Sequence, residues 1–229
     1  MDPANASTAF ERAKARYGDA AVAAGYDSWR YETPRGRRRN RRDLAAIGRA
    51  VDEAERRGGP VRTALDLPCG TGRLAPLFVA REIAASGADV SLAMLLESFR
   101  KLGKTFPIFQ CSADAVPLRD GAVDAVFAIR FLFHLDREAR GAVLAELARV
   151  ARRWMILDVR HRYNLKWVGW SIRHALGLLP RVQHRFSRAE LEHELAGVGL
   201  SVRGVFPSRR YFGWGSDKWT VLAERSVRG

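Results

Sequence analysis

The chain has 229 residues, of which 47% are hydrophobic, and it carries a formal net charge of +14 at pH 7. This length suits one α/β domain with additions, and no apolar run reaches the ~18 residues that a membrane-spanning helix needs. The first residues also lack the basic and then apolar pattern of a signal peptide, so we expect a cytoplasmic protein.

The excess of basic residues favours anionic partners. The chain has 39 lysine and arginine residues, most of them arginine, against 25 acidic residues. A strong positive field attracts nucleic acid, an anionic membrane surface, or a phosphorylated or carboxylated substrate. Cys69 and Cys111 are too few for a disulfide framework or a metal site. We therefore expect two free thiols and no bound metal.

Residues 1–60 are predicted to form a helical N-terminal arm ahead of the main domain, residues 61–229. The first helix of this arm is expected over residues 7–25. An aromatic cluster overlaps the end of this helix and extends beyond it, and it has two interpretations: a lid over a ligand, or packing of the arm on the main domain. The members of this cluster are Tyr17, Tyr26, Trp29 and Tyr31.

The arm also contains a basic run, PRGRRRNRR at residues 34–42, with six arginines. One interpretation is a solvated segment that leads into a helix from Asp43 to about Arg57. The other is a contact for phosphate groups of a lipid, a sugar phosphate or RNA. No aromatic residue interleaves with these arginines, so stacking on bases is not indicated.

The stretch TALDLPCGTGR, residues 63–73, predicts a buried strand, a glycine loop and the start of a helix. Gly70 and Gly72 also fit the dinucleotide pattern G-x-G-x-x-A. Asp66, at the end of the strand, decides between a dinucleotide and S-adenosylmethionine as the ligand. Its carboxylate would repel the pyrophosphate of a dinucleotide in a partly dry site. The ammonium and sulfonium groups of S-adenosylmethionine would instead be attracted.

Two further acids follow the next predicted strands. The second strand is expected over Glu82–Ala88, and Asp89 comes 23 residues after Asp66. An acid at about this spacing can accept hydrogen bonds from the vicinal hydroxyls of a ribose. Asp114 comes after the third strand, Pro107–Cys111, where it could accept a hydrogen bond from the amino group of an adenine.

The rest of the chain continues the alternation of strands and helices. This pattern predicts a doubly wound, mostly parallel sheet with helices on both faces, whose ligands bind at the carboxyl ends of the strands. An antiparallel strand pair is expected at the C-terminus. The later elements are helices from Ser91, over Arg137–Arg149 and from Ser187, and strands over Val123–Ile129, Trp154–Val159, Leu200–Phe206 and Lys218–Ala223.

Three acids at successive strand ends, with Gly-x-Gly after the first, resemble the class I S-adenosylmethionine-dependent methyltransferases. LDLPCGTGR is similar to the first motif of that family, ADVSLAML to the second, and CSADAVPLRDGAVDAVFAI to the third and fourth. The likeness covers residues 63–159. It implies a Rossmann-like sheet of seven strands and S-adenosylmethionine as the cofactor.

The resemblance also implies a cofactor site. Its residues would be Asp66, Gly70, Gly72, Arg73, Asp89, Val90, Asp114, Ala115 and Arg130. Asp66 and the two glycines would hold the methionine end, Asp89 the ribose, and Val90 the adenine ring. Asp114 would meet the adenine amino group. Arg73 would contact either the cofactor carboxylate or a partner on the surface.

The loop after the fourth strand, Arg130–Phe133, departs from two branches of that family. It lacks the Asn/Asp-Pro-Pro-Tyr of enzymes that methylate base amines or glutamine amides, and no Pro-Cys nucleophile pair follows the strand. His134 and His161 are the candidates for a general base, which helps when the acceptor is a hydroxyl or a protonated amine. For each residue taken alone, a structural or surface histidine is the stronger interpretation.

Residues 164–183 form an insertion with one apolar helical stripe, two tryptophans and several basic residues. This pattern is consistent with a helix packed on the domain or with a substrate lid. It is also consistent with a helix that lies on the inner face of an anionic membrane. The leading hypothesis is transfer of a methyl group to O or N of a small-molecule or lipid-linked, anionic acceptor. The alternatives are an RNA methyltransferase, without a recognisable RNA module, and a non-catalytic S-adenosylmethionine-binding protein.

Overall fold

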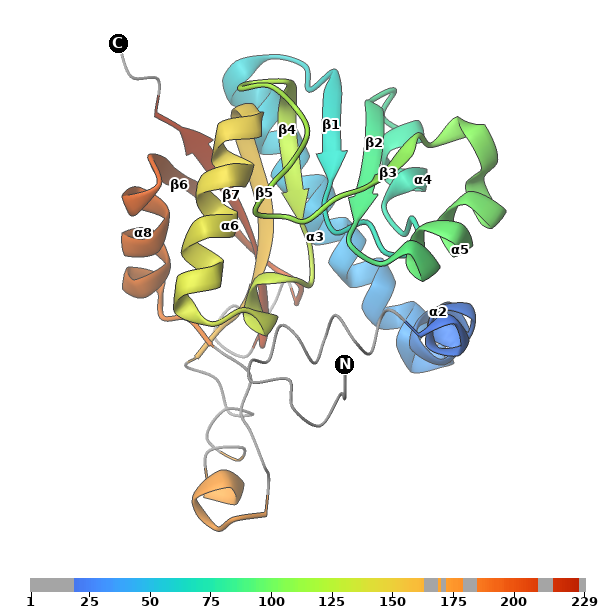
Figure 1. Ribbon diagram of the computed structural model, residues 1–229. Helices are drawn as coiled ribbons and strands as arrows, with labels where there is room; N and C mark the ends of the chain where they lie inside the picture. The colour runs from blue at the N-terminus through green and yellow to red at the C-terminus, as the bar shows by residue number, and fades with distance from the viewer. Residues whose placement is uncertain (1–18, 163–168, 170–171, 179–184, 210–215, 227–229) are drawn as a thin grey trace.

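The computed structural model describes residues 19–162, 169, 172–178, 185–209 and 216–226. Seven strands form one sheet in the order β3-β2-β1-β4-β5-β7-β6 (Figure 1). The strands are β1 (Thr63–Asp66), β2 (Ala84–Asp89), β3 (Ile108–Gln110), β4 (Val123–Ala128), β5 (Ala151–Arg160), β6 (Leu200–Pro207) and β7 (Lys218–Arg225). The first five pair in parallel, and β7 is antiparallel to both of its neighbours. The predicted doubly wound sheet with an antiparallel C-terminal pair is confirmed.

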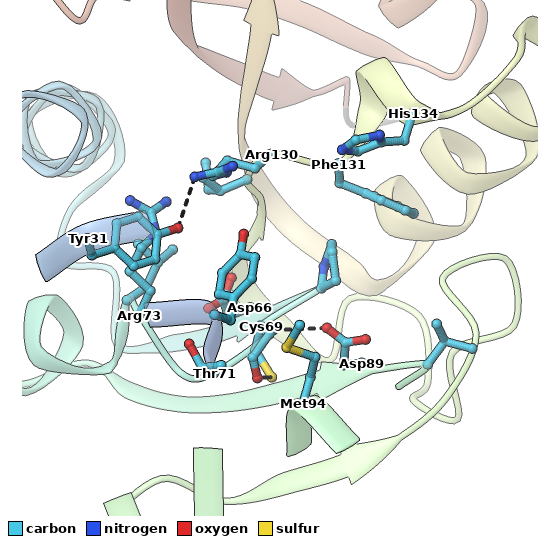
Figure 2. A pocket seen from close by; sticks show the side chains of 16 residues that line it. Tyr31, Asp66, Cys69, Thr71, Arg73, Asp89, Met94, Arg130, Phe131 and His134 are labelled. Carbon is cyan, nitrogen blue, oxygen red and sulfur yellow. Dashed lines mark hydrogen bonds between the residues drawn. The ribbon is translucent and has the colours of Figure 1, made fainter. Parts of the chain in front are cut away.

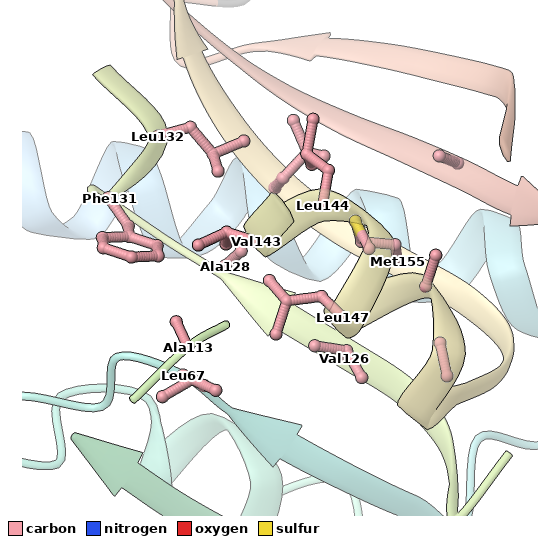
Figure 3. Close-up of a cluster of buried hydrophobic side chains, with 14 of the residues drawn as sticks. Leu67, Ala113, Val126, Ala128, Phe131, Leu132, Val143, Leu144, Leu147 and Met155 are labelled. Carbon is pink, nitrogen blue, oxygen red and sulfur yellow. The ribbon is translucent and has the colours of Figure 1, made fainter. Parts of the chain in front are cut away.

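Helices cover both faces of the sheet because its central strands are apolar on both sides. On one face lie α6 (Arg137–Val150) and α8 (Arg188–Gly197). Here Val126 and Ala128 of β4 pack with Leu144 and Leu147 of α6 (Figure 3). On the other face lie α3 (Pro34–Gly58), α4 (Ala75–Val79) and α5 (Leu92–Leu102). There Phe127 of β4 packs in a second cluster of buried side chains with residues of these helices.

The N-terminal segment lies at the carboxyl ends of the parallel strands, beside α5 (Figure 1). It consists of α2 (Ala20–Asp27) and a short π-helical turn, η2 (Ser28–Glu32). Asp19 caps α2 by accepting hydrogen bonds from two backbone N–H groups of its first turn. The helix predicted over residues 7–25 lies mostly outside the described residues, and its described part extends two residues further than expected.

The helix that carries the basic run starts earlier than predicted. It was expected from Asp43, but α3 begins at Pro34, with Thr33 as its cap. The Thr33 hydroxyl accepts a hydrogen bond from the N–H of Gly36 at 3.0 Å, and proline is well suited to the first helical position. The arginines of residues 34–42 therefore stand on the first turns of a helix, not on an irregular segment that leads into it.

Several large apolar side chains of α5 lie outside the face that this helix buries. Leu92, Leu96 and Phe99 are 55%, 60% and 51% exposed. Ser98 is fully buried instead, because α5 packs closely against the glycine loop: a Cβ on Gly72 would lie 2.7 Å from the Ser98 hydroxyl. Contact with this loop, and not hydrophobicity alone, sets the orientation of the helix.

Two predicted helix caps are confirmed. The Ser91 hydroxyl accepts from the N–H of Met94 at 3.2 Å, and Ser187 and Glu190 form both halves of a capping box. Short 3₁₀ turns follow α5 and β4, namely η3 (Gly103–Thr105) and η4 (Leu132–His134). Within the described residues, no helix combines the length and apolar character that crossing a bilayer requires.

Candidate functional site

A cavity opens at the carboxyl ends of β1, β2 and β4 (Figure 2). The space between its walls is about 900 Å³, a volume that includes solvent at the open mouth. Four parts of the chain supply its walls: the ends of β1 and β2, the glycine loop, the loop after β4, and the N-terminal segment. Its lining residues include Tyr26, Tyr31, Asp66, Gly70, Thr71, Arg73, Asp89, Val90, Met94, Arg130, Phe131 and His134.

Asp66, the last residue of β1, lies in the cavity wall and is only 2% exposed. Its Oδ1 atom is buried and has no hydrogen-bond partner among the described residues. Burial raises the pKa of this carboxyl to about 8; the nearby Arg73 opposes that shift and Asp89 adds to it. A buried carboxyl oxygen without a partner is costly. The site therefore suits a cationic group with N–H donors.

The glycine loop takes a backbone conformation that most residues avoid. Gly70 and Gly72 have φ angles of 55° and 76°, in the left-handed region that glycine enters without a steric penalty. The N–H of Gly70 donates to Asp89 Oδ2 at 2.9 Å. The N–H of Ser91 donates to the other oxygen of Asp89, also at 2.9 Å. These two bonds fix the Asp89 carboxylate at the cavity wall, where its remaining lone pairs can accept from hydroxyl groups.

The helix after this loop, α4, starts later than predicted. The stretch 63–73 predicted the start of a helix at its end, but α4 spans only Ala75–Val79. Arg73 lies in the turn that precedes it. The loop thus meets the cavity through its backbone and side chains, and not through a long helix that starts at Arg73.

The N-terminal segment closes one side of the cavity. Tyr26 and Tyr31 line it, with their rings in edge-to-face contact at 5.9 Å. Asp27 accepts a hydrogen bond from the hydroxyl of Thr71, in the glycine loop, at 2.7 Å, and it forms an ion pair with Lys101 of α5. Two members of the aromatic cluster thus contribute to the cavity wall as well as packing the arm on the domain. Tyr17 lies outside the described residues.

Arg130 forms the wall opposite the glycine loop. Its φ angle is 64°, which is unusual for a residue with a side chain. The N–H of Arg130 donates to Asp158 Oδ1 at 2.5 Å, and its guanidinium donates to the Tyr31 hydroxyl at 3.0 Å. Arg73 also lies beside Tyr31 (Figure 2), and it donates to Asn40 at 2.9 Å.

Residues 64–153 match a family model described as "Methyltransferase domain". This part of the chain is a methyltransferase domain. The match covers 90 of the 229 residues and includes the motifs that resemble the class I S-adenosylmethionine-dependent methyltransferases. No curated protein sequence matches it.

Solved structures with the same fold are distant in sequence. One is magnesium protoporphyrin IX methyltransferase from Synechocystis PCC 6803 with bound SAH, at TM-score 0.69 and 20% identity over 94% of this chain and 100% of the other. Another is a "possible histamine N-methyltransferase" from Thermotoga maritima, at TM-score 0.63 and 16% identity over 92% and 98%. An O-methyltransferase from neocarzinostatin biosynthesis matches at TM-score 0.57 and 17% identity over 73% and 50%. At these identities the likeness concerns the fold.

The methyltransferase brings most of its predicted site residues to this one cavity. Asp66, Gly70, Arg73, Asp89, Val90, Arg130 and His134 line it. Gly72 lies behind the loop, against α5. Asp114 and Ala115 do not line the cavity; Asp114 is exposed and accepts a hydrogen bond from Ser112.

The two candidate bases occupy different surroundings. His134 lines the cavity from η4, and its ring lies 4.5 Å from that of Phe133. His161 follows β5 outside the cavity walls and stacks on Trp219 at 3.7 Å. Burial and the neighbouring Arg185 lower the pKa of His161. Only His134 is placed to reach a ligand in this cavity.

Several wall residues were not among the predicted site residues. They are Pro68, Cys69, Thr71, Leu74, Met94, Ile129 and Phe131, beside the two tyrosines. Most are neighbours of the motif residues, so their adjacency was the available signal. The buried Cys69 thiol has its pKa raised by burial, which makes it a poor nucleophile. The described residues contain no group of three side chains suited to a metal ion.

Proposed function

We propose that this methyltransferase moves a methyl group from S-adenosylmethionine to an oxygen or nitrogen of a small, anionic acceptor. The observation that supports this most is the unpartnered, buried oxygen of Asp66 in a cavity that Arg130 also lines. A cavity with a carboxyl in one wall and a guanidinium in another suits a cationic cofactor next to an anionic acceptor.

The cavity residues fit the chemical groups of the cofactor. Asp66 would face its ammonium and sulfonium, and Asp89 would accept from its ribose hydroxyls. Val90 would lie against the adenine ring, and Arg73 would bind the carboxylate. Asp114 and Ala115 would have to approach from the loop after β3 to contact the adenine. When bound, S-adenosylmethionine supplies a methyl group on a sulfonium.

The protein then has three tasks. It must hold the acceptor in line with the methyl group and exclude water, for which Tyr26 and Tyr31 are placed at the cavity wall. It must also remove a proton when the acceptor is a hydroxyl or a protonated amine. His134 is the residue of the cavity that we assign to this step, because it lines the wall next to Arg130 and Phe131.

A lipid-linked acceptor is a second candidate, supported by the described part of the insertion. Ile172, Leu176 and Leu178 are 56%, 67% and 63% exposed. Apolar side chains next to basic ones favour a membrane surface. The tryptophans of the insertion, Trp167 and Trp170, lie outside the described residues. Flotation with liposomes that contain acidic lipids tests this candidate: absence of binding at low salt would dismiss it.

The acceptor class can be tested directly with methyl-labelled S-adenosylmethionine. The purified protein is incubated with a cell extract, which is then separated into lipid, RNA, protein and small molecules. We expect label among small molecules, or in lipid if the acceptor is lipid-linked. Label in RNA would instead support the RNA methyltransferase alternative. Binding of the cofactor without label in any fraction would support a protein that binds but does not transfer.

A further inference from the structure

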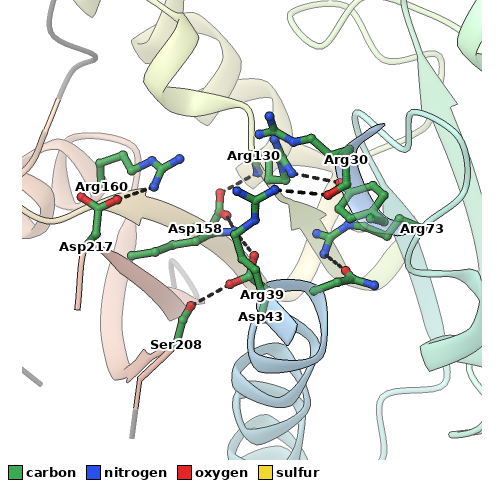
Figure 4. A network of polar contacts seen from close by, with 12 residues as sticks. Arg30, Arg39, Asp43, Arg73, Arg130, Asp158, Arg160, Ser208 and Asp217 are labelled. Atoms are coloured by element: carbon green, nitrogen blue, oxygen red, sulfur yellow. Dashed lines mark hydrogen bonds and ion pairs between the residues drawn. The ribbon is translucent and has the colours of Figure 1, made fainter. Parts of the chain in front are cut away.

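Three arginines gather around Tyr31, in and next to the cavity wall. The guanidinium carbons of Arg73 and Arg130 lie 5.6 and 5.8 Å from the centre of the Tyr31 ring. Figure 4 shows these two arginines together with Arg30. Arg30 precedes Tyr31 in the chain, and its charge acts on the tyrosine hydroxyl together with that of Arg73. Among the described residues, none of the three has a carboxylate within ion-pair distance.

Arginines that hold the fold together are paired differently. Arg140 of α6 binds Glu194 of α8 through two nitrogens, at 2.7 and 2.8 Å. Arg153 binds Glu224 at 2.8 Å. Positive charges close together repel one another, and no described carboxylate forms an ion pair with the three arginines at Tyr31, so their positive potential can attract an anion.

Arg130 is also held in place from two sides. Its backbone keeps a left-handed conformation that is strained for a residue with a side chain, and Asp158 holds the N–H in that conformation. Asp158 is fully buried and forms an ion pair with Lys218, which also binds Asp43 at 3.0 Å. At the other end, the Tyr31 hydroxyl accepts from the guanidinium. Within the described part of the chain this is one of its five N–H donors, which leaves the others for a ligand.

We propose that the guanidinium of Arg130 binds a carboxylate or phosphate group of the methyl acceptor, in the positive field of Arg30 and Arg73. A planar guanidinium held at a fixed angle matches the oxygens of either anion. This inference rests on the proposed function, which assigns Arg73 to the cofactor carboxylate and so leaves Arg130 for the acceptor. Its consequence is that a neutral acceptor of the same shape binds poorly.

The test uses the full chain saturated with S-adenosylhomocysteine, and three probes: benzoate, phenyl phosphate and the neutral benzamide. Titration calorimetry at low salt compares the wild type, Arg130→Gln and Arg62→Gln. Arg62 is the matched control because it is exposed and precedes β1, at the strand end opposite Asp66. We expect benzoate or phenyl phosphate to bind the wild type and the control at least tenfold more tightly than Arg130→Gln. The anion that binds more tightly distinguishes carboxylate from phosphate.

Two readouts separate this inference from the proposed function. If S-adenosylhomocysteine binds none of the proteins, the proposed function fails and the inference fails with it. If it binds all three equally but the anions bind Arg130→Gln as well as the control, or do not bind the wild type, only the inference is overturned. Loss of S-adenosylhomocysteine affinity in Arg130→Gln would assign Arg130 to the cofactor, and also overturns it. If Arg130→Gln does not fold, Arg130→Lys replaces it, because lysine keeps the charge but not the planar guanidinium. Equal anion affinity in Arg130→Lys and Arg62→Gln would then count against a site specific for guanidinium.

Discussion

Asp66 and Asp158 are two buried aspartates on parallel strands of one sheet, with opposite surroundings. Asp66 ends β1 at 2% exposure, and its Oδ1 has no partner among the described residues. Asp158 lies near the end of β5 at 0% exposure, where it accepts from the N–H of Arg130 and pairs with Lys218. The same side chain at similar depth is neutralised in one place and left uncompensated in the other.

This difference separates a residue that stabilises the fold from one that is kept for a ligand. Breaking a buried ion pair leaves an uncompensated charge and costs stability. A carboxyl that the folded protein leaves without a partner already carries that penalty, and a cationic ligand relieves it. Functional sites commonly give up stability in this way.

The largest effect is expected for Asp158→Asn. Lys218 loses a buried counter-ion, so we expect the free energy of unfolding to fall by about 3 kcal/mol, measured by urea denaturation. Asp52→Asn is the control, because Asp52 pairs with Arg81 but is 61% exposed, and such pairs contribute at most about 1 kcal/mol. Equal losses in the two variants would remove the structural role assigned to Asp158.

Asp66→Asn should show the opposite pattern. Removing the carboxylate that faces a cation in a partly dry site should lower affinity for S-adenosylmethionine about 100-fold, or about 2.7 kcal/mol. The free energy of unfolding at neutral pH should not fall and should rise, since no partner is lost and asparagine removes the cost of burying an ionisable carboxyl. Calorimetric titration and urea denaturation measure the two. A stability loss without an affinity loss would reverse the comparison.

His134→Ala tests the chemistry beside this pair of carboxyls. If His134 removes a proton from the acceptor, turnover should fall at least tenfold, while affinity for S-adenosylmethionine stays unchanged. His161→Ala is the companion variant, because His161 lies outside the cavity walls. Turnover assays with labelled cofactor decide between them, and unchanged turnover in His134→Ala would remove that residue from the mechanism.

A further prediction concerns pH. The pKa of Asp66 is about 8 in the folded protein and about 3.9 in the unfolded chain, so the folded state holds the extra proton between these values. Stability from this group therefore decreases as pH rises from 4 to 8, while affinity for a cation increases steeply from pH 6 to 8 as the carboxylate ionises. Asp66→Asn should flatten both profiles. Equal pH dependence in the wild type and the variant would show that another group titrates.

The strand ends and the glycine loop could be predicted because their signals are local. Gly70 and Gly72 mark a backbone that needs left-handed angles, and Asp66 and Asp89 follow short apolar runs. The antiparallel strand pair and the Ser187 capping box were likewise contained in a few consecutive residues. Each of these features depends on spacing within one segment.

The features that were missed depend on contacts between distant segments. The bond between Asp27 and Thr71 joins residues 44 positions apart, and the pairing of Asp158 with Lys218 connects two strands whose neighbourhood only the fold defines. The start of α3 was missed for another reason. Its signal, Thr33 before a proline, was present, but the charge of the following arginines favoured an irregular segment.

The most direct test of the role of Asp66 is a crystal structure of the protein with S-adenosylhomocysteine. We predict the ligand in the cavity at the ends of β1, β2 and β4, with Asp66 Oδ1 about 2.7–3.2 Å from its ammonium nitrogen or from a water that bridges to it. A ligand bound elsewhere, or an Asp66 oxygen that still has no partner in the complex, would contradict the account.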